Sequence, residues 1–358
     1  MKIVVFGLTI SSSWGNGHAT LWRGLLKALI RRGHAVVFFE RDTDYYRDNR
    51  DLHAIPGGDL VLYPDWGAVA ARAAREVAEA DVALVTSYCP DAPDAERAVL
   101  DAPRALRVFY DLDTPVTLAA LDGAEDRRPA YVGPDGFAGY DLVLSYTGGP
   151  ALDALRTRLG ARRVAPLYGH VDPELHRPVP REPRFATDLS YLGTYAADRQ
   201  AALDALFIQP ARMRPGAKFL IGGAQYPADF PWTDNIFFVR HLPPPDHPAF
   251  FSSGRLTLNV TRQAMAAMGW CPSGRLFEAA ACGAPILTDA WAGLDTFFAP
   301  GSELIVARGT GDALAAVDLT DAELARIGAA GRARVLGEHT SDHRAHDFEA
   351  AVAAARGG

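Results

Sequence analysis

The sequence predicts an α/β protein built from two parallel-sheet domains, because short apolar runs alternate with helical patterns and this alternation is interrupted once. The expected strands of the first domain are residues 3–7, 35–40, 60–63, 82–87, 106–111, 142–145 and 163–166. Those of the second domain are residues 188–193, 218–221, 236–239, 256–260, 285–288 and 304–306. In such domains the ligand binds at the carboxyl ends of the strands, so we look for site residues there.

Helical periodicity fills the gaps between strands and sets the expected domain boundaries. The clearest helices are residues 18–32, 68–80, 151–159, 321–336 and 341–355. Residues 170–183 are rich in proline and charge and lack a period, which indicates a linker. We expect a first domain at 1–172, a linker at 173–186 and a second domain at 187–338. The last helix, within 339–358, is long enough to cross back over the first domain.

Composition argues against several classes of protein. The 358 residues exceed one typical core, and the content of 49% hydrophobic and 22% charged residues is usual for a globular protein. A formal net charge of -7 without a basic block argues against a nucleic-acid partner. The N-terminal apolar run is too short for a signal peptide or a transmembrane segment. Cys89, Cys271 and Cys282 lack metal-ligand spacing and suit reduced thiols, which predicts a cytoplasmic location.

The strongest functional signal lies in residues 271–289, with the sequence CPSGRLFEAAACGAPILTD. Ser273 suits the N-cap of a helix whose first N–H groups, starting at Gly274, favour an anion. Glu278 comes about one and a half turns later, where a carboxylate accepts from sugar hydroxyls but repels phosphate. Gly283 is placed to end the helix. The segment therefore predicts a nucleoside-diphosphate site, whereas a plain surface helix would need neither its arginine nor its glutamate.

Three arginines are candidates for binding the diphosphate, because a planar guanidinium binds phosphate oxygens in pairs. They are Arg199, Arg262 and Arg275. Each has the alternative of being an ordinary surface arginine, and Arg199, at a helix start, has the least support. Two of the three would balance the phosphate charge without a metal ion.

A glycine loop in the first domain has two interpretations. Gly15-Asn16-Gly17 precedes a helix and Glu40 ends the next strand, as in dinucleotide-binding folds. However, Thr20 stands where the third glycine of that fingerprint belongs, and the loop is long. We therefore favour a loop in which Gly15 and Gly17 admit a donor sugar or phosphate.

The same domain supplies three candidates for chemistry. His18 begins the helix, where a neutral imidazole suits a base or a hydroxyl ligand, and the alternative is a capping or packing role. Asp111 and Asp113 follow one another at a strand end, and Asp113 suits the N-cap of the helix starting at Thr114. Their side chains project to opposite sides if the strand continues, so we expect at most one of them to face a ligand.

Taken together, these segments resemble the GT-B fold glycosyltransferases, in particular the group 1 glycosyltransferases and CgeB-like proteins. The resemblance is carried by PLYGHVDPELHRP, DLSYLGTYAADRQ, LNVTRQAMAAMGWCPSGRLFEAA, SSSWGNGHATLWRGL and VFYDLDTP, and it extends over nearly the whole chain. It implies two Rossmann-like domains facing across a cleft, with the C-terminal helix crossing back to the first domain.

The resemblance also implies an activity and further site residues. The activity is transfer of a sugar, hexosyltransferase-like, from a nucleotide-diphosphate sugar to an unknown acceptor, which is a small molecule, a glycan or a protein. The nucleotide-sugar is a co-substrate, and neither a metal nor another cofactor is expected. Gly193 and Thr194 would contact the donor, and His241 and Leu242 would lie at the nucleobase. Asp111 would lie at the reacting sugar.

One departure from the family keeps alternatives open. Many group 1 enzymes carry two glutamates eight positions apart, but eight positions before Glu278 this chain has Trp270. Retention or inversion at the anomeric carbon is therefore undecided. A nucleotide-sugar epimerase of the same shape and a nucleotide-sugar-binding protein without turnover remain alternatives.

Overall fold

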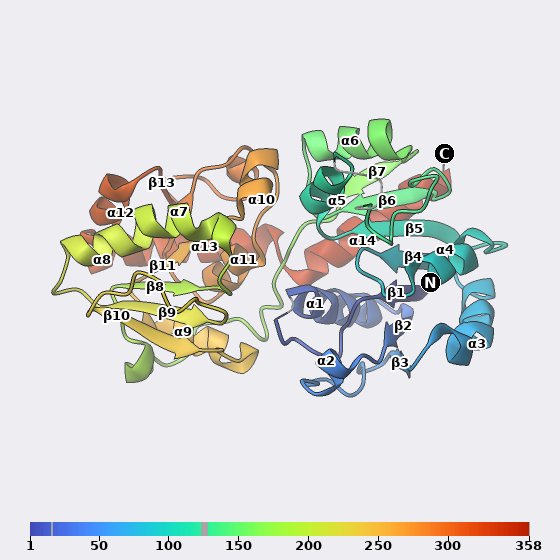
Figure 1. The fold of residues 1–358 in the computed structure, drawn as a ribbon, viewed down its shortest axis with the longest axis horizontal. Coiled ribbons are helices and arrows are strands. Elements are labelled where there is room, and N and C mark those ends of the chain that lie inside the picture. Colours follow the sequence, from blue (N-terminus) through green and yellow to red (C-terminus); the bar gives the residue numbers. More distant parts are fainter. Residues whose placement is uncertain (16, 123–127, 358) are drawn as a thin grey trace. The chain divides into compact units, whose positions relative to one another are not determined.

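The computed structural model of the chain describes residues 1–15, 17–122 and 128–357. Residue contacts divide it into two compact units, Met1–Tyr168 together with the residues from Ser341 onward, and Gly169–Thr340. Each unit has its own parallel sheet with helices packed around it (Figure 1). The predicted pair of Rossmann-like α/β sheets is confirmed.

The first unit contains a seven-stranded parallel sheet in the order β3-β2-β1-β4-β5-β6-β7. The strands are β1 (Lys2–Gly7), β2 (Ala35–Arg41), β3 (Asp59–Tyr63), β4 (Val82–Thr86), β5 (Leu106–Asp111), β6 (Leu142–Ser145) and β7 (Val164–Pro166). Central strands such as β4 are buried along their whole length, which explains their continuous apolar runs. The strand order changes direction between β1 and β4, and in sheets of this kind ligands bind at the carboxyl ends of the two strands at that point.

The helices of this unit include the last helix of the chain. They are α1 (Gly17–Arg31), α2 (Asp44–Arg47), α3 (Trp66–Ala78), α4 (Ala92–Leu100), α5 (Thr114–Ala120), α6 (Pro150–Leu159) and α14 (Ser341–Gly357). On α14, Phe348 and Val352 join the buried cluster that contains Leu26 of α1. Just past α1, Arg32 donates to Glu349 of α14 at 2.8 Å. The C-terminal helix is thus an integral part of the first unit.

The second unit contains a six-stranded parallel sheet in the order β10-β9-β8-β11-β12-β13. The strands are β8 (Leu189–Leu192), β9 (Phe219–Gly223), β10 (Ile236–Arg240), β11 (Leu256–Asn259), β12 (Ile286–Asp289) and β13 (Ile305–Ala307). The helices are α7 (Gln200–Leu203), α8 (Gln209–Met213), α9 (His247–Ser253), α10 (Gln263–Met268), α11 (Gly274–Ala281), α12 (Thr310–Val317) and α13 (Asp321–Glu338). Residues 173–186, which the sequence suggests as a linker, cluster with this unit.

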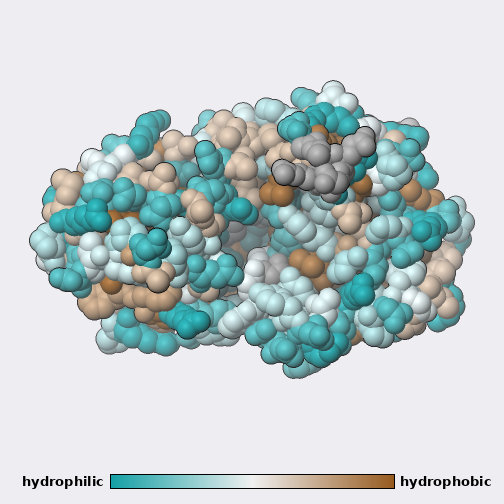
Figure 2. All heavy atoms as spheres, viewed as in Figure 1, coloured by the Kyte–Doolittle hydropathy of each residue, from teal (hydrophilic) through white to brown (hydrophobic). Residues whose placement is uncertain are grey.

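The visible surface is mainly hydrophilic, with apolar residues scattered over it (Figure 2). Cys89, Cys271 and Cys282 are buried and lie outside any disulfide. Within the described ranges, no helix has the length and the apolar composition that crossing a bilayer requires.

Candidate functional site

The predicted donor residues of the second unit lie after the carboxyl ends of its strands. Gly193 and Thr194 follow β8 directly, and Arg262 follows β11 as the N-cap of α10. Tyr226 donates its hydroxyl to the carbonyl of Gly193 at 3.0 Å, which fixes the loop after β8. This edge of a parallel sheet is the one at which ligands bind.

The helix α11 has the termini that the sequence predicts. The hydroxyl oxygen of Ser273 accepts from the backbone N–H of Arg275 at 3.3 Å, so Ser273 is the N-cap. At the other end, Gly283 has φ +76°, the left-handed conformation that ends helices. The remaining first-turn N–H groups and the positive end of the helix dipole favour an anion.

An ion pair between buried Glu278 and partly exposed Arg275 lies on α11. Glu278 is 5% exposed, and Nη1 of Arg275 donates to its Oε2 atom. Burial by itself would raise the pKa of the Glu278 carboxyl, but the positive charge and hydrogen bond of Arg275, together with the neighbouring histidines, lower it to about 2. The sequence analysis assigns Arg275 to phosphate and Glu278 to sugar hydroxyls, and it does not predict that the two side chains pair with each other. The side chain of Arg275 is 36% exposed, so it has room to turn toward a bound phosphate.

Two buried histidines flank Glu278. Nε2 of His176 and Nδ1 of His247 lie 4.0 Å and 3.9 Å from Oε2 of Glu278. Burial lowers the pKa of His176, and burial together with the Arg275 charge lowers that of His247 to about 3. Burial thus favours the neutral form of both imidazoles, and Arg275 provides the largest stabilising charge beside the carboxylate.

The other two candidate arginines are partly engaged within the unit. Arg262 donates its Nε to Asp198 at 3.1 Å, and Arg199 donates Nη1 to the carbonyl of Thr194 at 3.2 Å. The Nε of Arg199 is buried and has no hydrogen-bond partner among the described residues. Arg199 therefore keeps an unused donor near the carboxyl end of β8, and its phosphate role remains a prediction.

The backbone of His241 and Leu242 is less available to a nucleobase than the sequence suggests. The N–H of His241, which has φ +52°, donates to the carbonyl of Gly223 at 2.7 Å. The carbonyl of Leu242 faces Nε2 of His247 at 3.4 Å. These groups hold the turn after β10, so a contact with a base would have to come from the remaining atoms of this turn.

Trp270 replaces the first acid of the family pattern and has a structural role. It has φ +43°, and its N–H donates to the carbonyl of Ala292 at 2.7 Å. A Cβ atom on Gly293 would lie 2.5 Å from the Trp270 ring, so glycine is required for this close approach. The ring packs against backbone and supplies no charge near the donor.

In the first unit, Glu40 anchors the loop that carries the candidate glycines. Its carboxylate accepts from the hydroxyl of Thr9 at 2.8 Å and from the N–H groups of Ile10 and Ser11 at 2.8 and 2.9 Å. Glu40 is fully buried, so both oxygens serve the loop and neither faces a cofactor ribose. Among the candidates, Gly15 lies in this loop with φ +60°, Gly17 opens α1, and Asn16 lies outside the described residues.

His18 lies at the start of α1 beside an aspartate that follows β5. Its Nε2 is 3.6 Å from Oδ2 of Asp113, and the side chains are 19% and 23% exposed. The ring of Tyr88, which follows β4, lies 5.7 Å from the His18 ring. Asp113 is the N-cap residue of α5, as the sequence predicts, but its side chain makes no capping hydrogen bond.

Asp111 lies behind this pair, in the core of the unit. It is fully buried; its Oδ1 accepts from the hydroxyl of Thr117 at 3.0 Å and from the N–H of Asp113 at 3.2 Å. Its Oδ2 has no hydrogen-bond partner among the described residues. Burial raises the pKa of Asp111 to about 7. Asp113 is thus better placed than Asp111 for contact with a substrate, and Asp111 positions the turn that holds Asp113.

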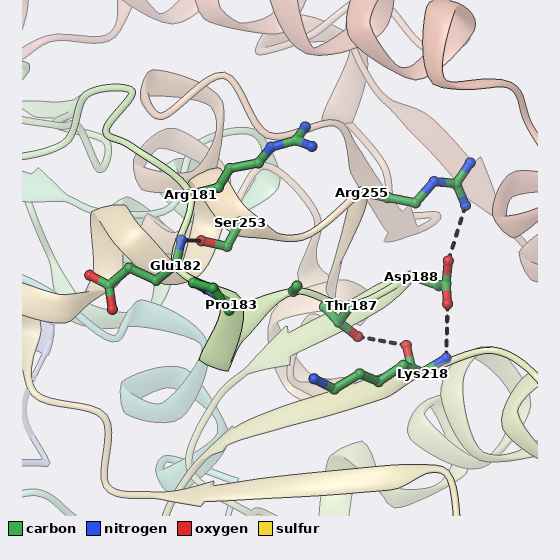
Figure 3. Close-up of a pocket in the computed structure, with 9 residues that line it drawn as sticks. Arg181, Glu182, Pro183, Thr187, Asp188, Lys218, Ser253 and Arg255 are labelled. Atoms are coloured by element: carbon green, nitrogen blue, oxygen red, sulfur yellow. Dashed lines mark hydrogen bonds and ion pairs between the residues drawn. The ribbon is translucent and has the colours of Figure 1, made fainter.

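A surface pocket of about 460 Å³ lies at the opposite edge of the second sheet (Figure 3). Its residues Asp188, Lys218 and Arg255 immediately precede β8, β9 and β11. Asp188 accepts from the N–H of Lys218 at 2.8 Å and from Arg255 at 3.3 Å, so these groups tie strand starts together (Figure 3). Because ligands bind at carboxyl ends in such sheets, we assign no function to this pocket.

Comparisons with known proteins give the class to which this architecture belongs. Two parallel-sheet units of this kind define the GT-B fold. Residues 199–350 match the model of a family described as glycosyl transferase-like. This match confirms the predicted glycosyltransferase class, while the likeness to CgeB-like proteins stays a prediction.

Solved structures with the same fold extend over almost the whole chain. Sucrose-phosphate synthase from Thermosynechococcus elongatus has a TM-score of 0.67, 14% identity and 97% coverage of both chains. HepE from Anabaena in complex with UDP-glucose has a TM-score of 0.67 and 14% identity, covering 99% of this chain and 100% of that one. An alpha-glucosyltransferase in complex with UDP-glucose and DNA has a TM-score of 0.70, 11% identity and 99% coverage of both. No curated protein matches the chain in sequence.

Proposed function

We propose that the protein transfers a sugar from a nucleoside-diphosphate sugar to a hydroxyl group of an acceptor. The observation that carries this proposal is the start of α11, where open N–H groups, Arg275 and the Glu278 carboxylate come together within the glycosyl transferase-like segment. The N–H groups and Arg275 bind the diphosphate, and Glu278 accepts from the ribose hydroxyls. Arg199 and Arg262 add positive charge, so the reaction needs no metal ion.

The catalytic base belongs to the first unit. His18 accepts the proton of the acceptor hydroxyl, and the oxygen attacks the anomeric carbon while the bond to the diphosphate breaks. The diphosphate leaves with the bonding electrons, and helix N–H groups and arginines stabilise its charge. The charge of Asp113, 3.6 Å from Nε2 of His18, stabilises the protonated form of the imidazole, as an acid does beside a catalytic histidine. A single displacement of this kind inverts the anomeric configuration.

The proposal also covers the donor, the acceptor and the cellular location of the enzyme. HepE and the alpha-glucosyltransferase are described as complexes with UDP-glucose, so uridine diphosphate sugars are the first donors to test. The acceptor is a small molecule, a glycan or a protein, since the net charge of -7 disfavours DNA. Three buried free cysteines fit a reducing cytoplasm.

The test combines binding with product analysis. Uridine, guanosine and adenosine diphosphates are compared by thermal shift in the presence of a chelator, and the matching sugar nucleotides are then followed by mass spectrometry. Transfer releases free nucleoside diphosphate. An epimerase instead yields an isomer of equal mass, and a binding protein gives a thermal shift without release. Absence of any nucleotide-dependent shift would overturn the proposal.

A further inference from the structure

Three buried side chains with metal-ligating atoms converge in the second unit. His176 comes from the segment before β8, His247 is the first residue of α9, and Glu278 lies in α11. Their ligating atoms all lie within 4.8 Å of one another, and each residue is at most 6% exposed. In the part of the chain that the structure describes, this is the cluster of histidine, cysteine and acidic groups with metal-ligand spacing.

The three groups converge without bonding to one another. The separations of 4.0 Å and 3.9 Å from Glu278 to the histidines exceed a hydrogen bond. Both ring nitrogens of His176 are buried and lack a hydrogen-bond partner among the described residues. Buried polar atoms without partners are costly, so a bound species that contacts all three groups would remove this cost.

We infer that His176, His247 and Glu278 form a binding site for a transition-metal ion of the Zn²⁺ type. Two imidazoles and one carboxylate are a common zinc ligand set, with the fourth position open to water or an anion. The edge of a tetrahedral zinc site is about 3.4 Å, so the ligating atoms, which lie within 4.8 Å of one another, have to draw together by at most about 1.4 Å. Nε2 of His247 faces the Leu242 carbonyl at 3.4 Å, which directs Nδ1 toward the site.

Arg275 competes with the metal, because its guanidinium occupies the Oε2 atom of Glu278 that the metal needs. The side chain of Arg275 is 36% exposed, so it can turn outward when the metal binds. An effect of zinc on the enzyme follows from the proposed function, in which Glu278 binds the ribose. If Glu278 binds the ribose, bound zinc withholds that carboxylate from the nucleotide and inhibits the enzyme.

The experiment uses the metal-free full chain, titrated with zinc by calorimetry and with Co²⁺ by visible absorption. We expect one site per chain and the strong Co²⁺ bands of four-coordinate geometry. His176→Ala, His247→Ala and Glu278→Gln should each weaken zinc binding at least tenfold. His346→Ala, on the exposed face of α14, should bind as the wild type does. Arg275→Gln should bind zinc more tightly, by about tenfold, since the competing cation is gone.

Two results would overturn the site. One is the absence of stoichiometric zinc binding. The other is unchanged zinc affinity in folded His176→Ala, verified by circular dichroism. If the core variants do not fold, Arg275→Gln still tests the site. An unchanged or lower zinc affinity in this variant would contradict the proposal that zinc and Arg275 compete for Oε2 of Glu278.

The affinity for nucleotide is measured separately from the affinity for zinc. Uridine diphosphate is titrated into the zinc-free and the zinc-loaded protein, with a correction for zinc bound by free nucleotide. We expect about tenfold weaker binding to the zinc-loaded form. Nucleotide binding without zinc binding would reject the metal site and support the proposed function. Zinc binding without any nucleotide binding supports the metal site and rejects the function.

Discussion

The Nε2 atom of His18 lies 3.6 Å from Oδ2 of Asp113, and both side chains are partly exposed at the carboxyl edge of the first sheet. His18 comes from the first turn of α1 and Asp113 from the turn after β5. The two strands that lead to them, β1 and β5, are separated in the sheet by β4 alone. A histidine and a carboxylate in this relationship suit a base and the acid that orients it.

Removal of His18 should separate catalysis from binding. His18→Ala should lower the turnover number at least about 10²-fold, because a general base is lost, and leave nucleoside-diphosphate affinity unchanged. Steady-state kinetics and calorimetry on the same variant measure both quantities. If His18 only packs or caps, the loss should appear in stability, at about 1 kcal/mol, with normal turnover of the folded protein.

Asp113→Asn should lower turnover about tenfold or more, since the amide keeps the shape but cannot stabilise the imidazolium. Its effect should be small when His18 is already alanine, because the two residues act as one unit. Asp101→Asn, at an exposed position, is the matched control. Additive losses in the double variant would contradict the pairing.

Arg275 and Glu278 should differ in their ligand preference. Arg275→Ala should weaken nucleoside-diphosphate binding more than nucleoside binding, because it removes a phosphate contact. Glu278→Ala should weaken both ligands equally, by roughly 1.5–3 kcal/mol, through loss of ribose hydrogen bonds. Calorimetry with uridine and uridine diphosphate measures the difference, with exposed Arg326→Ala as the control. Equal losses for both ligands in Arg275→Ala would refute its phosphate role.

Asp111 should make the stability of the first unit depend on pH. Its pKa is raised from 3.8 to about 7, so the folded state favours the protonated form. This contribution is fully present below pH 3.8 and is lost as the pH rises through 7, by at most about 4 kcal/mol. Asp111→Asn should therefore gain stability relative to the wild type between pH 5 and 8.

Urea unfolding across this range, with the exposed variant Asp101→Asn for comparison, measures that gain. A constant difference between wild type and Asp111→Asn from pH 5 to pH 8 would count against the buried neutral carboxyl.

Glu40→Gln should loosen the loop between β1 and α1. The amide NH₂ group cannot accept the bonds that one carboxylate oxygen accepts, which should cost about 1–3 kcal/mol. Turnover should fall because His18 follows this loop. Thermal melts and kinetics check both effects, and Glu79→Gln, which removes only an exposed ion pair with Lys2, should change stability by less than about 1 kcal/mol and leave turnover unchanged. Wild-type stability in Glu40→Gln would show that the loop does not depend on this anchor.

Hydrolysis of UDP-glucose by the enzyme should release β-glucose first, because a single displacement inverts the α-linked donor. Proton NMR at early times distinguishes the two anomers before they equilibrate. Initial release of α-glucose would exclude the direct role proposed for His18. Trp270 agrees with this expectation, since it supplies no carboxylate near the donor.

Local signals in the sequence were sufficient to predict the helices and strands, the fold class and the termini of α11. Apolar runs identified each strand to within two residues, and Ser273 and Gly283 marked the helix ends, because these signals act within a few neighbouring positions. The tertiary structure alone decided which side chains meet. Asp113 rather than Asp111 faces His18, since β5 ends at Asp111 and the following turn redirects the chain.

The surroundings of Glu278 were likewise beyond the sequence. Its neighbours His176 and His247 lie far from it along the chain. Their approach to Glu278 depends on the packing of two elements against α11, namely the segment that precedes β8 and the helix α9. Sequence periodicity reports which face of an element is buried, but carries no information on distances between elements. The pairing of Arg275 with Glu278 arises from that burial, because a carboxylate in the core is stable only with a cation beside it.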